Sequence, residues 1–293
     1  MRRAYFKFSW VALALVAPQL LVIFVFFYWP TIQALYWAFT LEQPWGGGNT
    51  WVGLDNFSKV LSDPYYWASV RVSVLYALAT TALAMAMALI LAVFADRQLA
   101  GYRVHRVALI WPYAVAAPAV GLAFRFVFNA NAGILSFLNT IAPDLWDPSQ
   151  SAWQAVLTIV VAGAWKQVAY SFIFFLAALQ SIPRSLTEAA AMDGARPFRR
   201  IFDLQLPLLT PTLFFLLVIN ITDSFTDSFG IVDTLTGGGP FRATDLMVYK
   251  IYSDGFRGFD YSGAAAQSIV LMVLVMALTF VQFRWIERRV HYV

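Results

Sequence analysis

The sequence predicts an all-α membrane protein with six transmembrane helices, both termini in the cytoplasm, and a cytoplasmic helix-turn-helix loop after the fourth helix. Three observations predict this fold class. Of the 293 residues, 60% are hydrophobic and only 12% are charged, whereas soluble domains carry about 25% charged residues. Six apolar stretches are each long enough to cross a bilayer, and lysine and arginine collect in alternate loops.

The six spans follow from the length of the apolar runs, because a helix needs about 20 apolar residues to cross the hydrocarbon core. Charges inside the runs are few. Arg125 lies near the end of the third run, where it is expected to reach outward, and Lys166 lies in the middle of the fourth. We therefore interpret residues 1–293 as one transmembrane domain. Its predicted spans are about residues 8–29, 72–95, 107–128, 153–179, 206–229 and 261–283.

The orientation follows from the positive-inside rule, by which cytoplasmic loops carry the excess of lysine and arginine. Thirteen of the 20 basic residues fall in one set of loops and five in the other. Both termini and the loop at about residues 181–205 are therefore predicted to be cytoplasmic. This topology explains the net charge of +4, so no nucleic-acid partner is expected. The basic loops are residues 1–7, 96–106, 180–203 and 284–293.

Several kinds of chemistry lack the residues that they need. The chain has no cysteine, and its two histidines, His105 and His291, are expected to be structural or solvated. We therefore expect no metal site and no catalytic residue. The glycines that precede Pro240 form a turn, and no G-x-x-x-x-G-K-[ST] pattern occurs. We expect no cofactor in this chain, and any nucleotide would have to be bound by another one.

The polar segment after the fourth span predicts two short helices joined by a sharp turn. Ser185 and Glu188 fit the N-cap and N3 positions of a capping box, and the residues up to Asp193 favour helix. Gly194 suits the left-handed position after a helix, and Pro197 suits the first turn of the next helix. The three alanines after Glu188 give a smooth face that suits docking of another protein. A connector that lies on lipid headgroups is the alternative.

The same segment carries a spacing pattern: E-A-A, three residues, G, nine residues, then L-x-L-P. This pattern resembles the loop of ATP-binding-cassette importer permeases, with Leu204 where isoleucine is usual. The stretches "APQL", "VGLDNF" and "TGGGP" resemble the carbohydrate-type permeases. Over the whole chain the resemblance is closest to the A-type permeases of sn-glycerol-3-phosphate importers. It is carried by "PYAVAAP", "WKQ", "AALQSIPRSL", "EAAAMDGA", "YKIYSDGF" and "AAQSIVLM".

The resemblance implies a non-enzymatic subunit of a bacterial inner-membrane importer for sn-glycerol-3-phosphate or a related glycerophosphodiester. It implies a heterodimer with a second permease, two cytoplasmic ATPase subunits and a periplasmic solute-binding protein. A sugar or polyol importer is one alternative, and a secondary transporter driven by an ion gradient is another, although the latter would favour discontinuous helices and duplicated halves, and no clear repeat relates the two halves of this sequence. The residues that the resemblance assigns to ATPase coupling are Glu188, Ala189, Ala190, Asp193, Gly194, Leu206 and Pro207.

Polar residues inside the spans are costly in a bilayer and usually face protein or water. A cationic Lys166 would lower the barrier for an anionic phosphate ester on a solute path. The alternative is a structural ion pair between Lys166 and either Asp223 or Asp227, which lie on one stripe of the fifth span. The candidates for lining the path are Lys166, Gln167, Tyr170, Asn220 and Asp223.

Overall fold

The computed structural model describes residues 10–42, 48–96 and 107–285. Three predictions fall partly or wholly outside these residues: the start of the first span at residue 8, several of the basic residues that set the orientation, and the roles of His105 and His291. Helices dominate the described chain. Its one sheet there is a short antiparallel pair, in which Thr40–Glu42 (β1) pairs with Asn49–Trp51 (β2).

The chain divides into two compact units, and the first comprises residues 1–63 and 251–270. Its N-terminal part is one helical run, in which a π-helical segment joins two α-helices. Asn56 ties the hairpin to the next helix, since its Nδ2 donates to the backbone oxygens of Ala38 at 3.0 Å and Thr40 at 2.9 Å. The elements of this unit are α1 (Trp10–Ile23), η1 (Phe24–Tyr28), α2 (Trp29–Ala38), β1, β2, α3 (Asp55–Ser62), η4 (Ser253–Arg257) and the start of α15 (Tyr261–Trp285).

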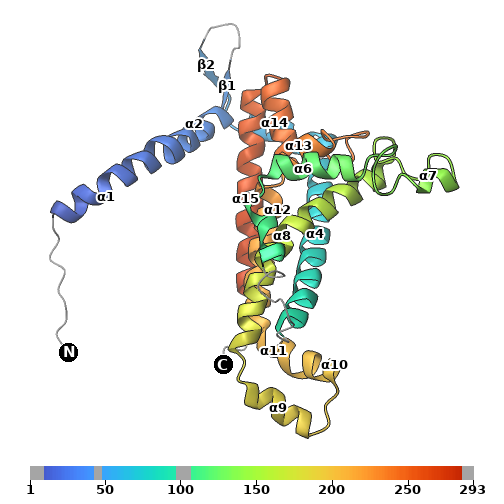
Figure 1. The fold of residues 1–293 in the computed structure, drawn as a ribbon. Helices are drawn as coiled ribbons and strands as arrows, with labels where there is room; N and C mark the ends of the chain where they lie inside the picture. The colour runs from blue at the N-terminus through green and yellow to red at the C-terminus, as the bar shows by residue number, and fades with distance from the viewer. Residues whose placement is uncertain (1–9, 43–47, 97–106, 286–293) are drawn as a thin grey trace. The chain divides into compact units, whose positions relative to one another are not determined.

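The second unit comprises residues 64–250 and 271–293 and contains the candidate sites. Within this unit α9 and α10 lie together at one end, and α6, α7 and α13 lie toward the other (Figure 1). Its elements are α4 (Pro64–Asp96), η2 (Trp111–Ala114), α6 (Ala117–Val127), α7 (Leu138–Ile141), α8 (Ala152–Ser181), α9 (Arg184–Met192), α10 (Pro197–Arg200), η3 (Ile201–Gln205), α11 (Leu206–Leu208), α12 (Thr210–Thr226), α13 (Phe229–Leu235), most of α14 (Met247–Tyr252) and the rest of α15.

The described residues contain four helices that are long and apolar enough to cross a membrane, and up to six spans if two bent helix pairs are counted. The bent pairs correspond to the third and fifth predicted spans, which the sequence predicted as uninterrupted. The bends measure 112° before α6 and 71° before α12. Pro118 and Pro211 lie in the first turn of the helix that follows each bend, where the missing N–H needs no intrahelical partner.

Helices α4 and α8 form the main packing contact of the second unit. Their shared core is rich in small residues: Ala84, Ala88 and Ala92 on α4 and Ala164 on α8 are almost completely buried. Small side chains let two membrane helices approach closely, so that van der Waals contacts replace a hydrophobic driving force that lipid cannot supply. The result is a well-packed helix pair, and α8 carries three of the polar candidates at its middle.

Candidate functional site

A polar cavity of about 420 Å³, which we call the central cavity, lies in the second unit, between α8, α12 and neighbouring elements. It brings together all five residues that the sequence suggested for a solute path. The structure adds residues that sequence reasoning did not single out, from α4, η2, α8, α12 and α13. The lining residues are Tyr76, Tyr113, Gly163, Lys166, Gln167, Tyr170, Asn220, Asp223, Ser224, Asp227, Ser228 and Ile231.

Lys166 and Asp227 form an ion pair across this cavity. Lys166 Nζ lies 2.5 Å from Asp227 Oδ2, and the two side chains are 19% and 64% exposed. Of the two partners that the pairing hypothesis left open, the structure therefore shows Asp227. The side chain of Asp223 makes no hydrogen bond or ion pair within the described residues, although it lines the same cavity. Lys166 is thus both paired and a lining residue, so the two sequence hypotheses are compatible.

A hydrogen-bond network joins α8 to α12 beneath the ion pair. Gln167 Nε2 donates to Asn220 O at 3.2 Å and to Ser224 Oγ at 3.0 Å. Asn220 Nδ2 donates to Ser171 Oγ at 3.0 Å. Two buried acceptors, Gln167 Oε1 and Asn220 Oδ1, have no hydrogen-bond partner among the described residues. Buried polar atoms are normally paired, so these carbonyl oxygens are suited to accept hydrogen bonds from solute hydroxyls.

Aromatic rings form another part of the wall. The rings of Tyr113 and Tyr170 stack with their centroids 6.1 Å apart and an angle of 25° between their planes. The ring of Tyr170 also packs against that of Phe174, with 4.7 Å between the centroids. Tyr113 comes from η2, in the broken third span, and sequence reasoning did not single it out. Tyr76 was equally hidden, because it lies in a charge-free span. A break around "PYAVAAP" was the signal that could have drawn attention to Tyr113.

The coupling candidates lie on and after α9, and the turn that follows this helix matches the prediction. Gly194 has φ +76°, in the left-handed region. The N–H of Ala195 donates to Ala190 O at 3.0 Å, and the N–H of Gly194 donates to Ala191 O at 3.1 Å. This is the pair of hydrogen bonds of a Schellman motif. Pro197 then opens α10, as the sequence predicted.

The start of α9 differs from the predicted capping box. The helix begins at Arg184, its N-cap is Pro183, and no side chain makes a capping hydrogen bond. Ser185 is therefore inside the helix, and Glu188 does not cap it. The proline explains the shift, since its fixed φ orders the chain two residues earlier than the predicted serine cap would. Without a capping role, Glu188 remains exposed at the surface of α9.

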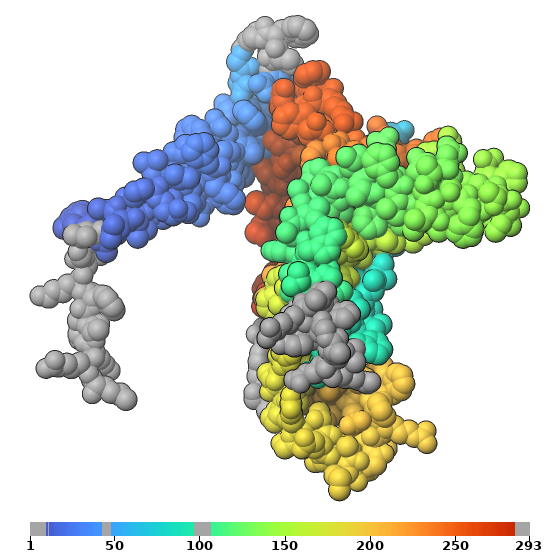
Figure 2. Space-filling model, viewed as in Figure 1, coloured from blue at the N-terminus to red at the C-terminus, as the bar shows by residue number. Residues whose placement is uncertain are grey.

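The remaining coupling candidates differ in exposure. Ala189 is exposed and Ala190 is half-buried on α9, while Asp193 is the exposed C-cap. Figure 2 shows the α9 and α10 segment as the projecting end of the second unit. Leu206 and Pro207 belong instead to α11, next to the 71° bend that leads into α12. The structure thus places one group on an exposed helix and the other at the joint between that helix pair and a span.

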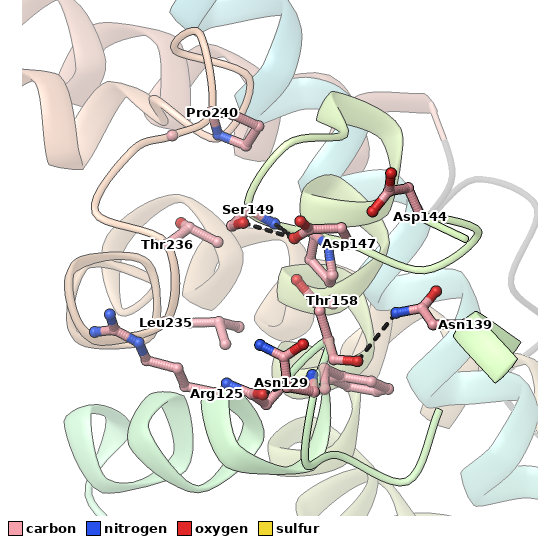
Figure 3. Close-up of a pocket in the computed structure, with 15 residues that line it drawn as sticks. Arg125, Asn129, Asn139, Asp144, Asp147, Ser149, Thr158, Leu235, Thr236 and Pro240 are labelled. Carbon is pink, nitrogen blue, oxygen red and sulfur yellow. Dashed lines mark hydrogen bonds between the residues drawn. The ribbon is translucent and has the colours of Figure 1, made fainter. Parts of the chain in front are cut away.

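A second polar pocket of about 400 Å³ lies where α6, the α7 region and the loop after α13 meet. Figure 3 shows Arg125 and Asp144 on opposite sides of it. Asp147 is already engaged, because it accepts hydrogen bonds from the backbone N–H and the hydroxyl of Ser149 at 2.9 and 2.6 Å. Asn139 is engaged as well, since its Nδ2 donates to the backbone oxygens of Ala130 and Trp146. Much of this pocket's polar surface is therefore used to hold its own loops.

Among the described residues, no three histidine, cysteine, aspartate or glutamate side chains come close enough to hold a metal ion. The central cavity offers groups that suit recognition of a polar ligand. It contains one ammonium group, two carboxylates, two unpartnered carbonyl oxygens and several hydroxyls. Such a set can bind and orient a small polar solute.

The chain is similar to known transport permeases over its whole length. The family model described as binding-protein-dependent transport system inner membrane component matches residues 6–292. A relative in Brucella abortus biovar 1 (strain 9-941), named sn-glycerol-3-phosphate transport system permease protein UgpA, is 49% identical over 278 residues, or 95% of each chain. A relative with the same name in Rhizobium meliloti (strain 1021) is 48% identical over 292 residues, or 100% of each chain.

Solved structures share the fold. The crystal structure of a bacterial ABC transporter involved in the import of the acidic polysaccharide alginate matches with a TM-score of 0.81 at 21% identity, over 95% of this chain and 96% of that one. The alginate transporter in complex with an alginate pentasaccharide-bound periplasmic protein matches with a TM-score of 0.80 at 21% identity, over 96% and 95%. At this identity the likeness concerns the helical fold alone.

Proposed function

The chain belongs to the family of binding-protein-dependent transport system inner membrane components, and from that premise we propose that it is the permease subunit of an ATP-driven importer for sn-glycerol-3-phosphate or a related glycerophosphodiester. The observation that carries the solute class is the full-length identity of 48% and 49% to permeases named for sn-glycerol-3-phosphate transport. The central cavity supports it, because Lys166 offers a cation for a phosphate group and carbonyl oxygens for hydroxyls lie nearby.

The partners follow from what this chain lacks and what it exposes. A nucleotide-binding pattern is missing from its sequence, so ATP hydrolysis belongs to two separate cytoplasmic ATPase subunits and this chain needs no cofactor. A second permease completes the membrane-spanning path as a heterodimer. A periplasmic binding protein delivers the solute, and the similar alginate transporter was solved with such a protein. The bilayer is the remaining partner.

We place α9 and α10 on the cytoplasmic side, together with both termini, because the basic residues collect in those loops. The exposed face of α9, with Glu188, Ala189 and Ala190, would dock in the ATPase. A short helix that ends in a Schellman motif at Gly194 is stiff, so it passes a displacement on instead of absorbing it. Leu206 and Pro207 lie at the joint where that displacement would enter α12.

The path itself runs through the central cavity. Lys166 would hold the phosphate group while the oxygens of Gln167 and Asn220 accept hydrogen bonds from the glycerol hydroxyls. Tyr170 forms an aromatic wall on the same side. The Asp223 carboxylate, which has no hydrogen-bond or ion-pair partner within the described chain, would repel the phosphate and so orient the solute with its phosphate toward Lys166.

The solute class is tested with the cognate periplasmic protein and the reconstituted complex. We expect the binding protein to bind sn-glycerol-3-phosphate tightly and maltose weakly in calorimetry. We also expect ATP-dependent uptake of the radiolabelled phosphate ester into proteoliposomes that contain both permeases and the ATPase. Tight binding of a sugar with no binding of the phosphate ester would overturn the solute assignment and favour a sugar or polyol importer. Uptake without ATP under an ion gradient would overturn the transport class.

A further inference from the structure

The charges of the central cavity do not suit an anion while Lys166 is paired. The cavity is lined by one lysine and two aspartates, Lys166, Asp223 and Asp227. The only cationic group among these described lining residues is already occupied by Asp227. Like charges placed close together repel one another. A phosphate ester that entered the cavity as it stands would therefore meet net negative charge.

The ion pair is asymmetric in a way that lets one partner leave. Lys166 lies at the middle of α8 with its side chain only 19% exposed, whereas the Asp227 side chain is 64% exposed. Turning the Asp227 carboxylate away from the pair is opposed by fewer neighbours within this chain than turning Lys166 away would be, because Asp227 is the more exposed partner. Leaving Lys166 without any anion costs much more, because a poorly solvated charge without a partner is strongly unfavourable. Lys166 therefore exchanges one anion for another more readily than it stays alone.

The backbone at Asp227 also favours movement. Asp227 is the C-cap of α12, with φ −104° and ψ 8°, and α13 begins two residues later at Phe229. Its N–H still donates to Asp223 O at 2.8 Å, so its position is defined by the end of α12. A side chain at a break between two helices can turn away without disturbing a helix interior.

We propose that Asp227 is a displaceable counter-ion: the solute's phosphate group takes its place on Lys166, and Asp227 pairs again with Lys166 when the solute leaves. This inference rests on the proposed function and goes beyond it by assigning a selectivity role to Asp227. A neutral polyol cannot displace a carboxylate from an ammonium group, so the ion pair excludes it. Re-pairing also opposes prolonged retention of the anion, because carboxylate and phosphate compete for one ammonium group.

The test compares variants of the complete complex, with both permeases and the ATPase in lipid nanodiscs, by retention of radiolabelled sn-glycerol-3-phosphate. Asp227→Asn removes the competitor, so we expect the solute to be retained about tenfold more tightly. Turnover of ATP-driven uptake should fall because release becomes slow. Asp227→Glu keeps the competing carboxylate and should stay near wild type. Lys166→Gln should lose retention of the phosphate ester.

A purely structural ion pair makes different predictions, which the double variant separates. If the pair only holds α8 to α12, Lys166→Gln with Asp227→Asn should restore assembly and full uptake through a neutral hydrogen bond. Under our proposal the double variant assembles but retains the phosphate ester as poorly as Lys166→Gln alone. Full uptake by the double variant would overturn the proposal, as would retention by Asp227→Asn that is equal to or weaker than wild type.

A measurement on the wild-type complex covers the case in which Asp227→Asn fails to assemble. Labelling of carboxylates with a water-soluble carbodiimide, read by mass spectrometry, should increase at Asp227 when sn-glycerol-3-phosphate is added, and glycerol should have no effect. Unchanged labelling would overturn the exchange.

The retention experiment separates failure of this inference from failure of the proposed function. Undiminished retention of the phosphate ester by Lys166→Gln would refute the path role of Lys166 as well as the exchange. Lost retention in Lys166→Gln without a gain in Asp227→Asn would refute the exchange alone.

Discussion

Gly194 occupies a position that only the backbone restricts. Its φ of +76° is one that L side chains rarely adopt, yet a Cβ placed there would meet nothing within 4 Å. A side chain at this position would therefore not clash with any neighbour. It would instead strain the turn by about 1–2 kcal/mol, because the left-handed conformation disfavours a Cβ. The two Schellman hydrogen bonds that stiffen the end of α9 depend on that conformation.

We expect Gly194→Val to leave the complex assembled while ATP hydrolysis becomes uncoupled from uptake. The branched side chain forces the turn out of the left-handed region, so the end of α9 loses its fixed direction. ATPase activity and solute uptake should be measured on the same proteoliposomes, and uptake per ATP should fall severalfold. Gly194→Asn is the matched control, since asparagine tolerates this conformation. Normal coupling in the valine variant would refute the role of the turn.

Single residues also mark how far the sequence could predict the site. Lys166 and the stripe on the fifth span were identifiable because charges are rare in apolar runs. The choice between Asp223 and Asp227 as its partner was not, since both lie on one face of one helix and the choice depends on where α12 ends. Tyr113 and Tyr76 were hidden for a different reason. Aromatic residues are abundant in this chain, and only tertiary packing decides which of them face a cavity.

At the scale of elements, the length of an apolar run predicted where spans lie but could not predict their shape. The third and fifth runs read as uninterrupted, and each contains prolines that a membrane helix can tolerate. The structure bends them by 112° and 71°. Whether a proline lies in a helix interior or begins a new helix depends on tertiary packing, such as the packing of α6 against α13. A local sequence pattern does not contain that information. The capping box failed similarly, because Pro183 starts α9 before Ser185.

The contact between α4 and α8 makes a prediction about helix packing. A Cβ on Gly163 would clash with the Tyr76 hydroxyl, and it would lie 3.1 Å from Thr80 Cγ2. We expect Gly163→Ala to destabilise the purified protein by about 1–3 kcal/mol, because an overpacked core must shift its neighbours. Thermal unfolding in detergent would measure this. Combining it with Tyr76→Phe removes the nearest atom and should recover part of the loss.

The outcome of that double variant decides whether the hydroxyl of Tyr76 sets the spacing of the two helices. If Gly163→Ala with Tyr76→Phe is as unstable as the sum of the single variants, the close approach is limited by the backbones instead. Additive effects are expected only for residues that do not touch, so a positive coupling between these two positions would support the contact seen here. Tyr76→Phe alone is the control for loss of the hydroxyl.

At the scale of the whole molecule, the protein is a multi-pass inner-membrane component. Composition alone indicated a membrane protein, and the spacing of the loop motif indicated the family. The solute could not be derived in that way, because the cavity that would recognise it is assembled from α4, η2, α8, α12 and the start of α13. Each of these contributes only one to four lining residues, so no single segment carries the pattern.

The absence of cysteine from the sequence allows a direct test of topology. Met192→Cys on α9 and Gln150→Cys before α8 both create one thiol at an exposed position. With a membrane-impermeant maleimide, we expect Gln150→Cys to react in right-side-out vesicles and Met192→Cys to react only in inside-out vesicles. The cysteine-free parent chain is the control for background. The reverse pattern would contradict the cytoplasmic placement of α9.

Lys166 and Gln167 lie at the centre of α8, which runs from Ala152 to Ser181. A straight helix of this length measures about 45 Å. If it tilts as a rod about its centre by about 10°, its two ends swing by about 4 Å in opposite directions, by the same geometry. The ammonium group near the fulcrum hardly moves. One rocking motion would thus carry the two ends of α8 in opposite directions, around a charge that stays in place.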